Sequence, residues 1–211
     1  VVQELTARFP ATFELTTGAV VFALAIGIPL GIGSAIYKDE SLDHGSRLMA
    51  ISGVSVPQFW MAILAQLLFY SYLGWLPSGG RFPQNLAKPP EATGMMLVDS
   101  ALALRLDAFL ASLEHLALPV IVLSLGTLAQ TTRITRSSMI ETLNQDYIEW
   151  SRAHGFKSKV ILIRHALRNA IMPVITAVGL SYGLLLGGSV VIEIVFNIRG
   201  IGLFLYNAVL A

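Results

Sequence analysis

The sequence DYIEWSRAHGFKSKVILIRHALRNAIMPV, Asp146–Val174, interrupts an otherwise strongly apolar chain. It carries seven Asp, Glu, Lys or Arg residues and one central glycine, Gly155. Apolar residues at near-helical spacing run into it from Met139 to Trp150, which predicts a helix with one apolar stripe. Gly155 should end this helix, because glycine is favoured just beyond a helix C-terminus. Ser158 should then cap a second helix that continues into the next apolar stretch.

The surrounding sequence is that of a membrane protein. Of its 211 residues 55% are hydrophobic and only 13% are charged, whereas roughly a quarter are charged in a soluble domain. Four runs without Asp, Glu, Lys or Arg reach the roughly 18 to 20 residues that a membrane-spanning helix needs: Leu15–Tyr37, Leu48–Gly80, His115–Thr132 and Asn169–Ile192. We therefore expect an all-α polytopic membrane bundle with about four spans, near residues 13–37, 48–73, 115–135 and 169–193.

The basic residues predict which side of the membrane each loop faces. Segment 38–47 holds two Lys or Arg residues and segment 133–168 holds seven, against five on the other side. Because cytoplasmic loops carry the excess of Lys and Arg, we expect these two segments in the cytoplasm. Both visible chain ends and the loop 76–114 are then expected on the outer side.

Glycines and acidic residues mark further positions on the predicted spans. Gly27 and Gly31 lie four residues apart, so they give one helix face without side chains, where a second helix can approach closely. We expect the pair Gly187 and Gly188 to serve helix packing in the last span. Two acids border spans near the predicted outer interface, where water should reach them: Glu14 and Glu193.

Several kinds of chemistry have no residues to support them. The chain has no cysteine and no P-loop pattern, and its histidines are scattered at His44, His115, His154 and His165. We therefore expect no catalytic site and no metal site in this chain. The residues of 146–167 alone leave two roles open: an amphipathic helix can fill a groove on a partner protein, or it can lie on the membrane surface.

The charged segment resembles the signature loop of importer-type ABC transporter permeases, a Glu-Ala-Ala triplet followed after three residues by glycine. Here the triplet positions are Glu149, Trp150 and Ser151, and the glycine is Gly155. Trp150 and Ser151 depart from the two alanines, and Arg168 departs from a proline that ends the general pattern. The stretches QDY, HALRNA, TRSSM, LLLGGSVVIE and GIG resemble the dipeptide, oligopeptide and nickel branch of the family.

The resemblance implies a type I importer fold with residues 1–211 as one permease domain. Such permeases typically have six spans, so the chain is expected to be a fragment without the first and last. The implied partners are a second, similar permease, two cytoplasmic ATPases that bind ATP and Mg, and an extracytoplasmic binding protein that delivers the substrate. The long outer loop favours di- or oligopeptides as the substrate.

The resemblance also assigns a coupling loop, residues 137–168, that sits in a cleft of the ATPase. It implies coupling roles for ten residues: Asp146, Tyr147, Glu149, Trp150, Ser151, Arg152, Ala153, Gly155, His165 and Arg168. Two other classes remain as alternatives. A polytopic membrane enzyme would need paired catalytic groups inside spans, and Ser124, Ser181 and Ser189 have no nearby base at that depth. An ion-coupled secondary transporter would not need the coupling motif.

Overall fold

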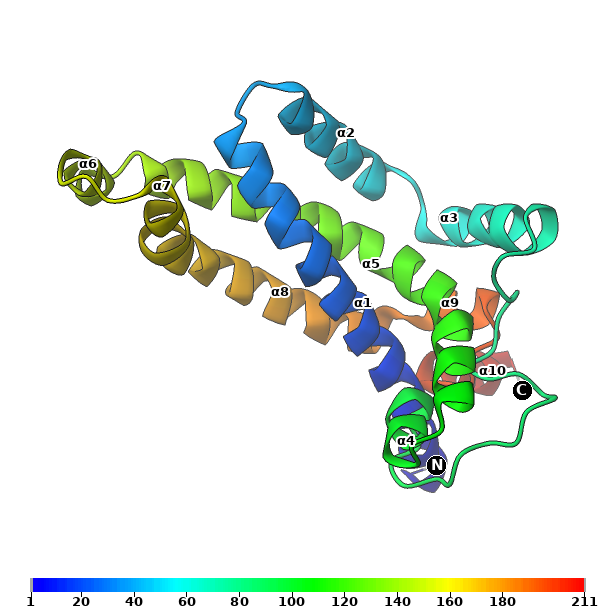
Figure 1. Cartoon of the computed structure of the whole chain (residues 1–211). Helices are drawn as coiled ribbons and strands as arrows, with labels where there is room; N and C mark the ends of the chain where they lie inside the picture. Colours follow the sequence, from blue (N-terminus) through cyan, green and yellow to red (C-terminus); the bar gives the residue numbers. More distant parts are fainter. Residues whose placement is uncertain (1, 211) are drawn as a thin grey trace. The chain divides into compact units, whose positions relative to one another are not determined.

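The structure is a computed structural model that describes the backbone of residues 2–210, and their side chains except at 2, 49–52, 54 and 188. Within this part of the chain every regular element is helical, so the all-α prediction is confirmed (Figure 1). In chain order the elements are α1 (Val2–Ile36), α2 (Ser41–Ser55), α3 (Gln58–Ala65), the π-helix η1 (Gln66–Tyr72), α4 (Met96–Leu102), α5 (Leu106–Leu143), α6 (Asp146–Ala153), α7 (Ser158–Val160), the π-helix η2 (Ile161–Leu167), α8 (Arg168–Gly188), α9 (Val190–Val195) and α10 (Ile201–Leu210).

Three helical stretches among the described residues are long and apolar enough to cross a membrane. They are Gln3–Ile36, Leu106–Leu143 and Ser158–Gly187. These stretches overlap the predicted spans near 13–37, 115–135 and 169–193. Each is longer than the uncharged run that it overlaps, because the helical backbone continues past the first charged residues.

The predicted span near 48–73 is divided in the structure. Helix α2 ends at Ser55 and α3 begins at Gln58, with Pro57 between them at φ −57° and ψ 133°. Proline cannot donate a backbone hydrogen bond, and it disfavours the helical conformation of the residue before it. The pieces have 15, 8 and 7 residues in α2, α3 and η1, so none of them alone has the length of a span.

The chain forms two compact units, which are described separately. The first comprises Val1–Ala19, Val56–Ser124 and Tyr182–Ala211, and the second comprises Val20–Ser55 and Leu125–Ser181. Helices α1, α5 and α8 each contribute residues to both units. The second unit contains the whole charged segment Asp146–Val174.

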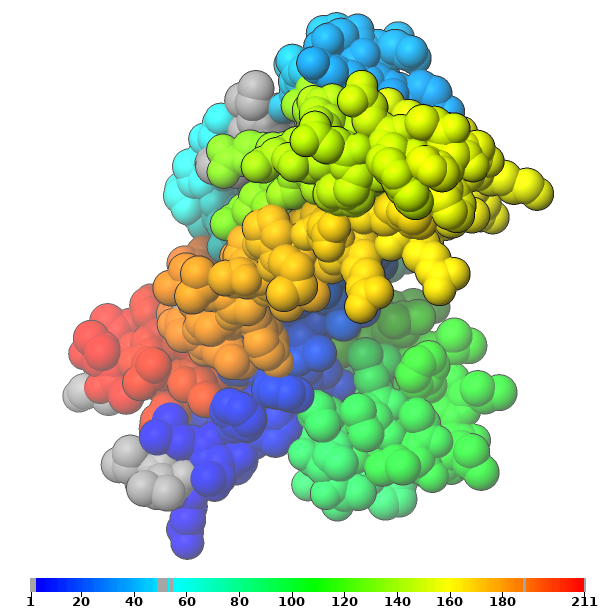
Figure 2. Space-filling view, turned by 90° about the vertical axis from the view of Figure 1, so that its left-hand side faces the viewer, coloured from blue at the N-terminus to red at the C-terminus, as the bar shows by residue number. Residues whose placement is uncertain are grey.

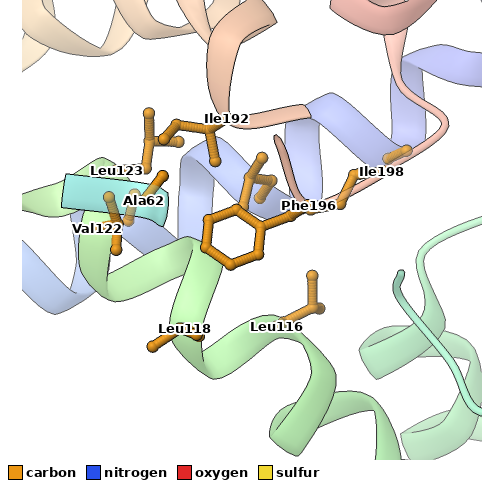
Figure 3. Close-up of a cluster of buried hydrophobic side chains, with 11 residues drawn as sticks. Ala62, Leu116, Leu118, Val122, Leu123, Ile192, Phe196 and Ile198 are labelled. Atoms are coloured by element: carbon orange, nitrogen blue, oxygen red, sulfur yellow. The ribbon is translucent and has the colours of Figure 1, made fainter. Parts of the chain in front are cut away.

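The first unit is built around Phe196, which is fully buried. Its ring lies among side chains of α5 and α9, including Leu116, Leu118 and Ile192 (Figure 3). Gly79 approaches the same residue so closely that an added Cβ would collide with the Phe196 carbonyl oxygen, and the next amide, that of Gly80, donates to this oxygen at 2.7 Å. The turn that follows η1 is thereby fixed against the end of α9.

Burial of the two border acids corrects the expectation that water reaches them. Glu193 is fully buried, and its carboxylate accepts hydrogen bonds from the Thr12 and Ser189 hydroxyls and from the Leu203 amide at 2.7 to 3.0 Å. The Glu14 carboxylate accepts from Arg81 and from the amide of Leu97. Both acids hold segments of the first unit together, because a buried carboxylate is stable only when its oxygens are hydrogen-bonded.

The second unit brings the C-terminal part of α1 against α5. An added Cβ at Gly27 would lie 3.0 Å from Thr131 Cγ2, and one at Gly31 would lie 2.5 Å from Thr135 Cβ. Real Cβ atoms essentially never come as close as 2.5 Å, so the approach at Gly31 requires glycine, whereas a side chain at Gly27 would fit only if Thr131 shifted. Next to this crossing, Ala35 of α1 enters an apolar cluster with Met139, Ile148, Ile161, Ala166 and Ala170.

Candidate functional site

A non-helical turn at residues 144–145 separates α6 from the long helix α5 before it. Helix α5 ends at Leu143, and Gln145 is extended at φ −81° and ψ 148°. The amides of Asn144 and Gln145 bond back to the carbonyls three residues earlier, which tightens the last turn. The prediction of one continuous helix from Met139 to Trp150 is therefore wrong. Asp146 and Glu149 in the first turn of α6 favour a new helix start at this point.

Gly155 ends α6, as the sequence predicts. Its φ is +76°, in the left-handed region that glycine adopts without steric cost. The Gly155 amide donates to the Arg152 carbonyl at 3.0 Å, and the Phe156 amide donates to the Ser151 carbonyl at 3.3 Å. These two bonds define a Schellman motif, which satisfies carbonyls at the end of the helix. An added Cβ here would meet nothing within 4 Å, so the requirement for glycine is conformational and not steric.

The second helix starts without the predicted cap. Ser158 is the first residue of α7, and Lys157 stands at the N-cap position with no side-chain hydrogen bond to the helix. The prediction that Ser158 caps this helix is therefore wrong by one residue. Helix α7 continues directly into η2 and α8, so α6, residues 154–157, α7 and η2 form one bent segment, called the elbow below (residues 146–167).

The inner face of the elbow fastens α6 to η2. Ile148 and Ser151 are buried. The Ser151 hydroxyl donates to the Tyr147 carbonyl at 2.7 Å, and its oxygen lies 3.2 Å from Nδ1 of His165. The His165 ring also contacts Phe156, with ring centroids 5.4 Å apart. His165 and Ser151, which the sequence analysis proposed for coupling, thus lie together inside the elbow.

The outer face of α6 is polar and aromatic. Tyr147 and Trp150 are 40% and 57% exposed, and the Trp150 ring stacks on His154 with centroids 3.8 Å apart. The other exposed coupling candidates on this helix are Asp146, Glu149, Arg152 and Ala153. Side chains of this part of the chain, coloured yellow-green to yellow, protrude at the surface in Figure 2. The surface therefore offers both signs of charge around an exposed indole ring.

A groove of about 560 Å³ lies beside the elbow. The ends of α1 and α5 supply an apolar wall through residues such as Ile36 and Leu143, and the elbow supplies Arg152 and Phe156. Lys38 adds a second cation to its lining. The groove thus joins the outer face of α6 to the ends of the two long helices.

The remaining candidates lie away from the elbow's outer face. Arg168 is exposed at the start of α8. Gly187 is exposed, and among the described residues nothing lies within 4 Å of a Cβ added to it. It therefore makes no close helix contact of the kind that Gly27 and Gly31 make. The surroundings of Gly188 lie outside the described residues.

Sequence reasoning missed a buried acid in the second unit. Asp43 in the first turn of α2 is fully buried, and it accepts two hydrogen bonds from Arg136, at 2.6 Å from Nε and 2.8 Å from Nη2. These bonds hold the pKa of the Asp43 carboxyl far below its ordinary value, although burial opposes the shift. Asp43 and Arg47 at i, i+4 signal only a surface ion pair, and nothing in the local pattern points to Arg136, 93 residues away.

No group of three or more His, Cys, Asp or Glu side chains that could hold a metal occurs in the part of the chain that the structure describes. What the charged segment forms is a connection between helices. A short helix with an exposed mixed surface is fastened to two long apolar helices through a turn that depends on glycine.

Long apolar helices joined by such an elbow are typical of a helical integral membrane protein. Residues 27–211 match the family described as binding-protein-dependent transport system inner membrane component. The chain belongs to this family, and the resemblance noted from its motifs is confirmed.

Two bacterial transport proteins are similar to this chain over nearly its whole length. The chain is 43% identical over 211 residues to the probable D,D-dipeptide transport system permease protein DdpB of Escherichia coli (strain K12), covering 100% of this chain and 62% of the relative. It is 40% identical over 206 residues to the di/tripeptide transport system permease protein DppB of Pseudomonas aeruginosa (strain UCBPP-PA14), covering 98% of this chain and 61% of the relative. The chain thus spans about three fifths of the length of these relatives.

Proposed function

We propose that the chain is part of the membrane-spanning permease subunit of an ATP-driven, binding-protein-dependent importer. The observation that carries the proposal is the elbow. Its α6 shares one apolar cluster with α1, α5 and α8 through Ile148, Ala35, Met139 and Ala170, while its outer face stays exposed. Family membership gives this arrangement its meaning, because loops with a short coupling helix are typical of the family.

The outer face of α6 is the docking surface for a cytoplasmic ATPase in this proposal. Trp150 is held in place by stacking on His154, so little side-chain freedom is lost when it enters a cleft. Glu149 and Arg152 supply polar contacts around it. ATP and Mg bind to the ATPase and not to this chain, which has no P-loop sequence.

Rigid coupling is the physical requirement that the elbow meets. Closure of two ATPase subunits around ATP moves the docked α6, and a flexible loop would absorb that movement. Here the Schellman turn at Gly155 and the Ser151–His165 contact hold α6 against η2. The movement therefore reaches α8 and α5, and it switches the permease between inward-open and outward-open states.

The orientation follows from the basic residues. Segments 38–47 and 133–168 face the cytoplasm of a bacterial-type inner membrane, since they hold nine of the 14 Lys and Arg residues. The elbow is then on the ATPase side, and loop 76–114 faces outward toward an extracytoplasmic binding protein. A second, similar permease completes the pathway.

Di- or oligopeptides are the proposed substrates. Relatives at 38 to 43% identity carry names that refer to D,D-dipeptide, di/tripeptide or dipeptide transport. The substrate is delivered by the binding protein, so this chain contributes the path more than the selectivity.

ATP-dependent uptake with the full-length protein tests the proposal. The protein is expressed with its neighbouring permease, ATPases and binding protein, and complexes are purified in mild detergent. We expect co-purification with the ATPases and peptide uptake into proteoliposomes that requires ATP. Uptake that continues without ATP and follows an ion gradient would instead support a secondary transporter.

A matched pair of tryptophan substitutions locates the docking surface in the same experiment. Trp150→Ala should reduce ATPase co-purification at least about tenfold, because tryptophan anchors at interfaces typically contribute 2 kcal/mol or more. Trp75→Ala removes a tryptophan that is 69% exposed next to the loop 76–114 proposed to face outward, and it should leave co-purification unchanged. Equal effects of both substitutions would contradict the assignment of α6.

A further inference from the structure

One buried carboxylate, that of Asp43, joins three elements of the second unit. It accepts hydrogen bonds from the Ser34 hydroxyl of α1 at 2.5 Å, from the Asp39 amide at 3.0 Å and from Arg47 within α2 at 2.7 Å. Arg136 of α5 completes the set with two hydrogen bonds at 2.6 and 2.8 Å. Paired bonds of this kind fix both distance and angle between a guanidinium and a carboxylate.

The neighbouring contact between α1 and α5 contains no comparable bond. Gly27 and Gly31 present bare backbone to α5. The hydroxyls of Thr131, Thr132 and Thr135 on α5 are buried and have no hydrogen-bond partner among the described residues. The contact between these faces rests on van der Waals packing, which is far less directional than a hydrogen bond. The directional bonds of Arg136 to Asp43 therefore set the position of α5 along α1 and α2.

Arg136 lies where the movement of α6 would be transmitted in the proposed mechanism. It lies about two helical turns before Leu143, where α5 ends and the chain passes through residues 144–145 into α6. A displacement of α6 is thus delivered to the end of α5 and, through Arg136, to the corner between α1 and α2. Without the paired bonds, α5 can shift while α1 and α2 stay behind.

We propose that Asp43 and Arg136 are positioning residues that make the end of α1 and the start of α2 move together with the elbow during transport. The inference rests on the proposed function, in which the elbow receives the movement of an ATPase. It adds a second mechanical connection, between the helices of one subunit, to the connection between subunits.

Two variants of the complete transporter test the connection between Asp43 and Arg136. Arg136→Lys keeps the charge but loses the two-pronged geometry. The double variant Asp43→Asn/Arg136→Gln removes both charges, so no buried ion is left unpaired, and the shorter glutamine cannot make the paired bonds. Both should form complexes with the ATPases in normal amount and hydrolyse ATP, while transport per ATP falls about fivefold or more.

Arg47→Gln is the matched control. It removes another ion pair of the same carboxylate, but Arg47 belongs to α2, as Asp43 does, so the connection to α5 is kept. Transport per ATP should be unchanged. If the Asp43–Arg136 pair only stabilised the fold, the variants would lower complex yield and transport together. Transport per ATP would then stay constant in all variants, and that result would overturn the proposal. Loss of ATPase association by the unaltered protein would instead count against the proposed function.

A distance measurement tests the connection between α2 and α5 while Asp43 and Arg136 are left unchanged. Residues 1–211 contain no cysteine, so spin labels are placed at His44→Cys on α2 and Ser137→Cys on α5, both exposed positions, in a full-length subunit in which any cysteine outside this range is replaced by serine. With label-free partner subunits, the distance between the labels should be the same in the nucleotide-free and ATP-bound transporter. A change beyond the spread of the labels would show that α2 and α5 move independently and would overturn the proposal.

Discussion

Asn169 in the first turn of α8 donates a hydrogen bond of 2.8 Å from Nδ2 to the hydroxyl of Tyr147 in α6. This bond ties the short helix directly to a helix long enough to span the membrane. Both side chains are exposed, so water competes for the bond and its contribution to stability is small. In the proposed mechanism, the bond helps to fix the orientation of α6 relative to α8.

Tyr147→Phe tests that orientation. The change keeps the ring but removes the acceptor of the Asn169 amide, and we expect a loss of at most about 1 kcal/mol in stability. Transport per ATP should fall measurably in proteoliposomes, while ATPase co-purification is kept. Tyr206→Phe serves as the control, since Tyr206 is an exposed tyrosine of α10. An identical small effect of both substitutions would argue against a role of the bond in coupling.

Gly155→Ala tests the turn. At φ +76° an alanine side chain is strained by about 1 to 2 kcal/mol, so the Schellman turn should open and uncouple ATP hydrolysis from transport without preventing membrane insertion. The comparison is Gly45→Ala, because Gly45 lies in α2 with no atom within 4 Å of an added Cβ and without a positive φ. Coupled transport at the normal level in Gly155→Ala would refute the assigned role of the glycine.

Gly31→Ala tests the helix crossing in the second unit. The new Cβ would lie 2.5 Å from Thr135 Cβ and 2.8 Å from the Thr132 carbonyl oxygen, so the helices must separate. We expect a loss of about 1 to 3 kcal/mol, as for other overpacked sites, seen as a lower Tm of the detergent-solubilised protein. Gly126→Ala in α5 has open space around it and should leave the Tm nearly unchanged. A Tm of Gly31→Ala equal to that of Gly126→Ala would contradict the close crossing.

The pH dependence of stability tests the buried pair. Arg136 holds the pKa of Asp43 well below its ordinary value of 3.8, so the carboxylate's contribution is fully present above pH 3.8 and is lost as the pH falls further. The Tm difference between the unaltered protein and Asp43→Asn should stay constant from pH 8 to pH 5 and shrink below about pH 4. A Tm difference that already changes between pH 8 and pH 5 would mean that the pair does not lower this pKa.

Local rules of sequence explain what could be predicted. Long uncharged runs must form helices in lipid, and a glycine after an amphipathic stretch favours a left-handed turn, which is found at Gly155. The break at Asn144 and Gln145 was missed because the apolar spacing continues across it. Hydrophobic periodicity reports which face is buried, and two helices in succession can keep the same period.

Long-range pairing explains most of what could not be predicted. The partners Asp43 and Arg136 are 93 residues apart, and Thr12 and Glu193 are 181 apart. A charge next to a predicted span is compatible with water, lipid headgroups or a buried partner, and only the fold selects among them. Pro57 is a local signal within the second uncharged run, and it divides the span predicted near 48–73.

The proposed contact between the outer face of α6 and an ATPase can be tested by photo-cross-linking in the assembled transporter, with a photoreactive amino acid at position 150 and, as the control, at position 75. We expect an ATP-sensitive cross-link from position 150 to the ATPase subunit and none from position 75. Absence of the cross-link from position 150 in a complex that transports peptide would contradict the proposed contact.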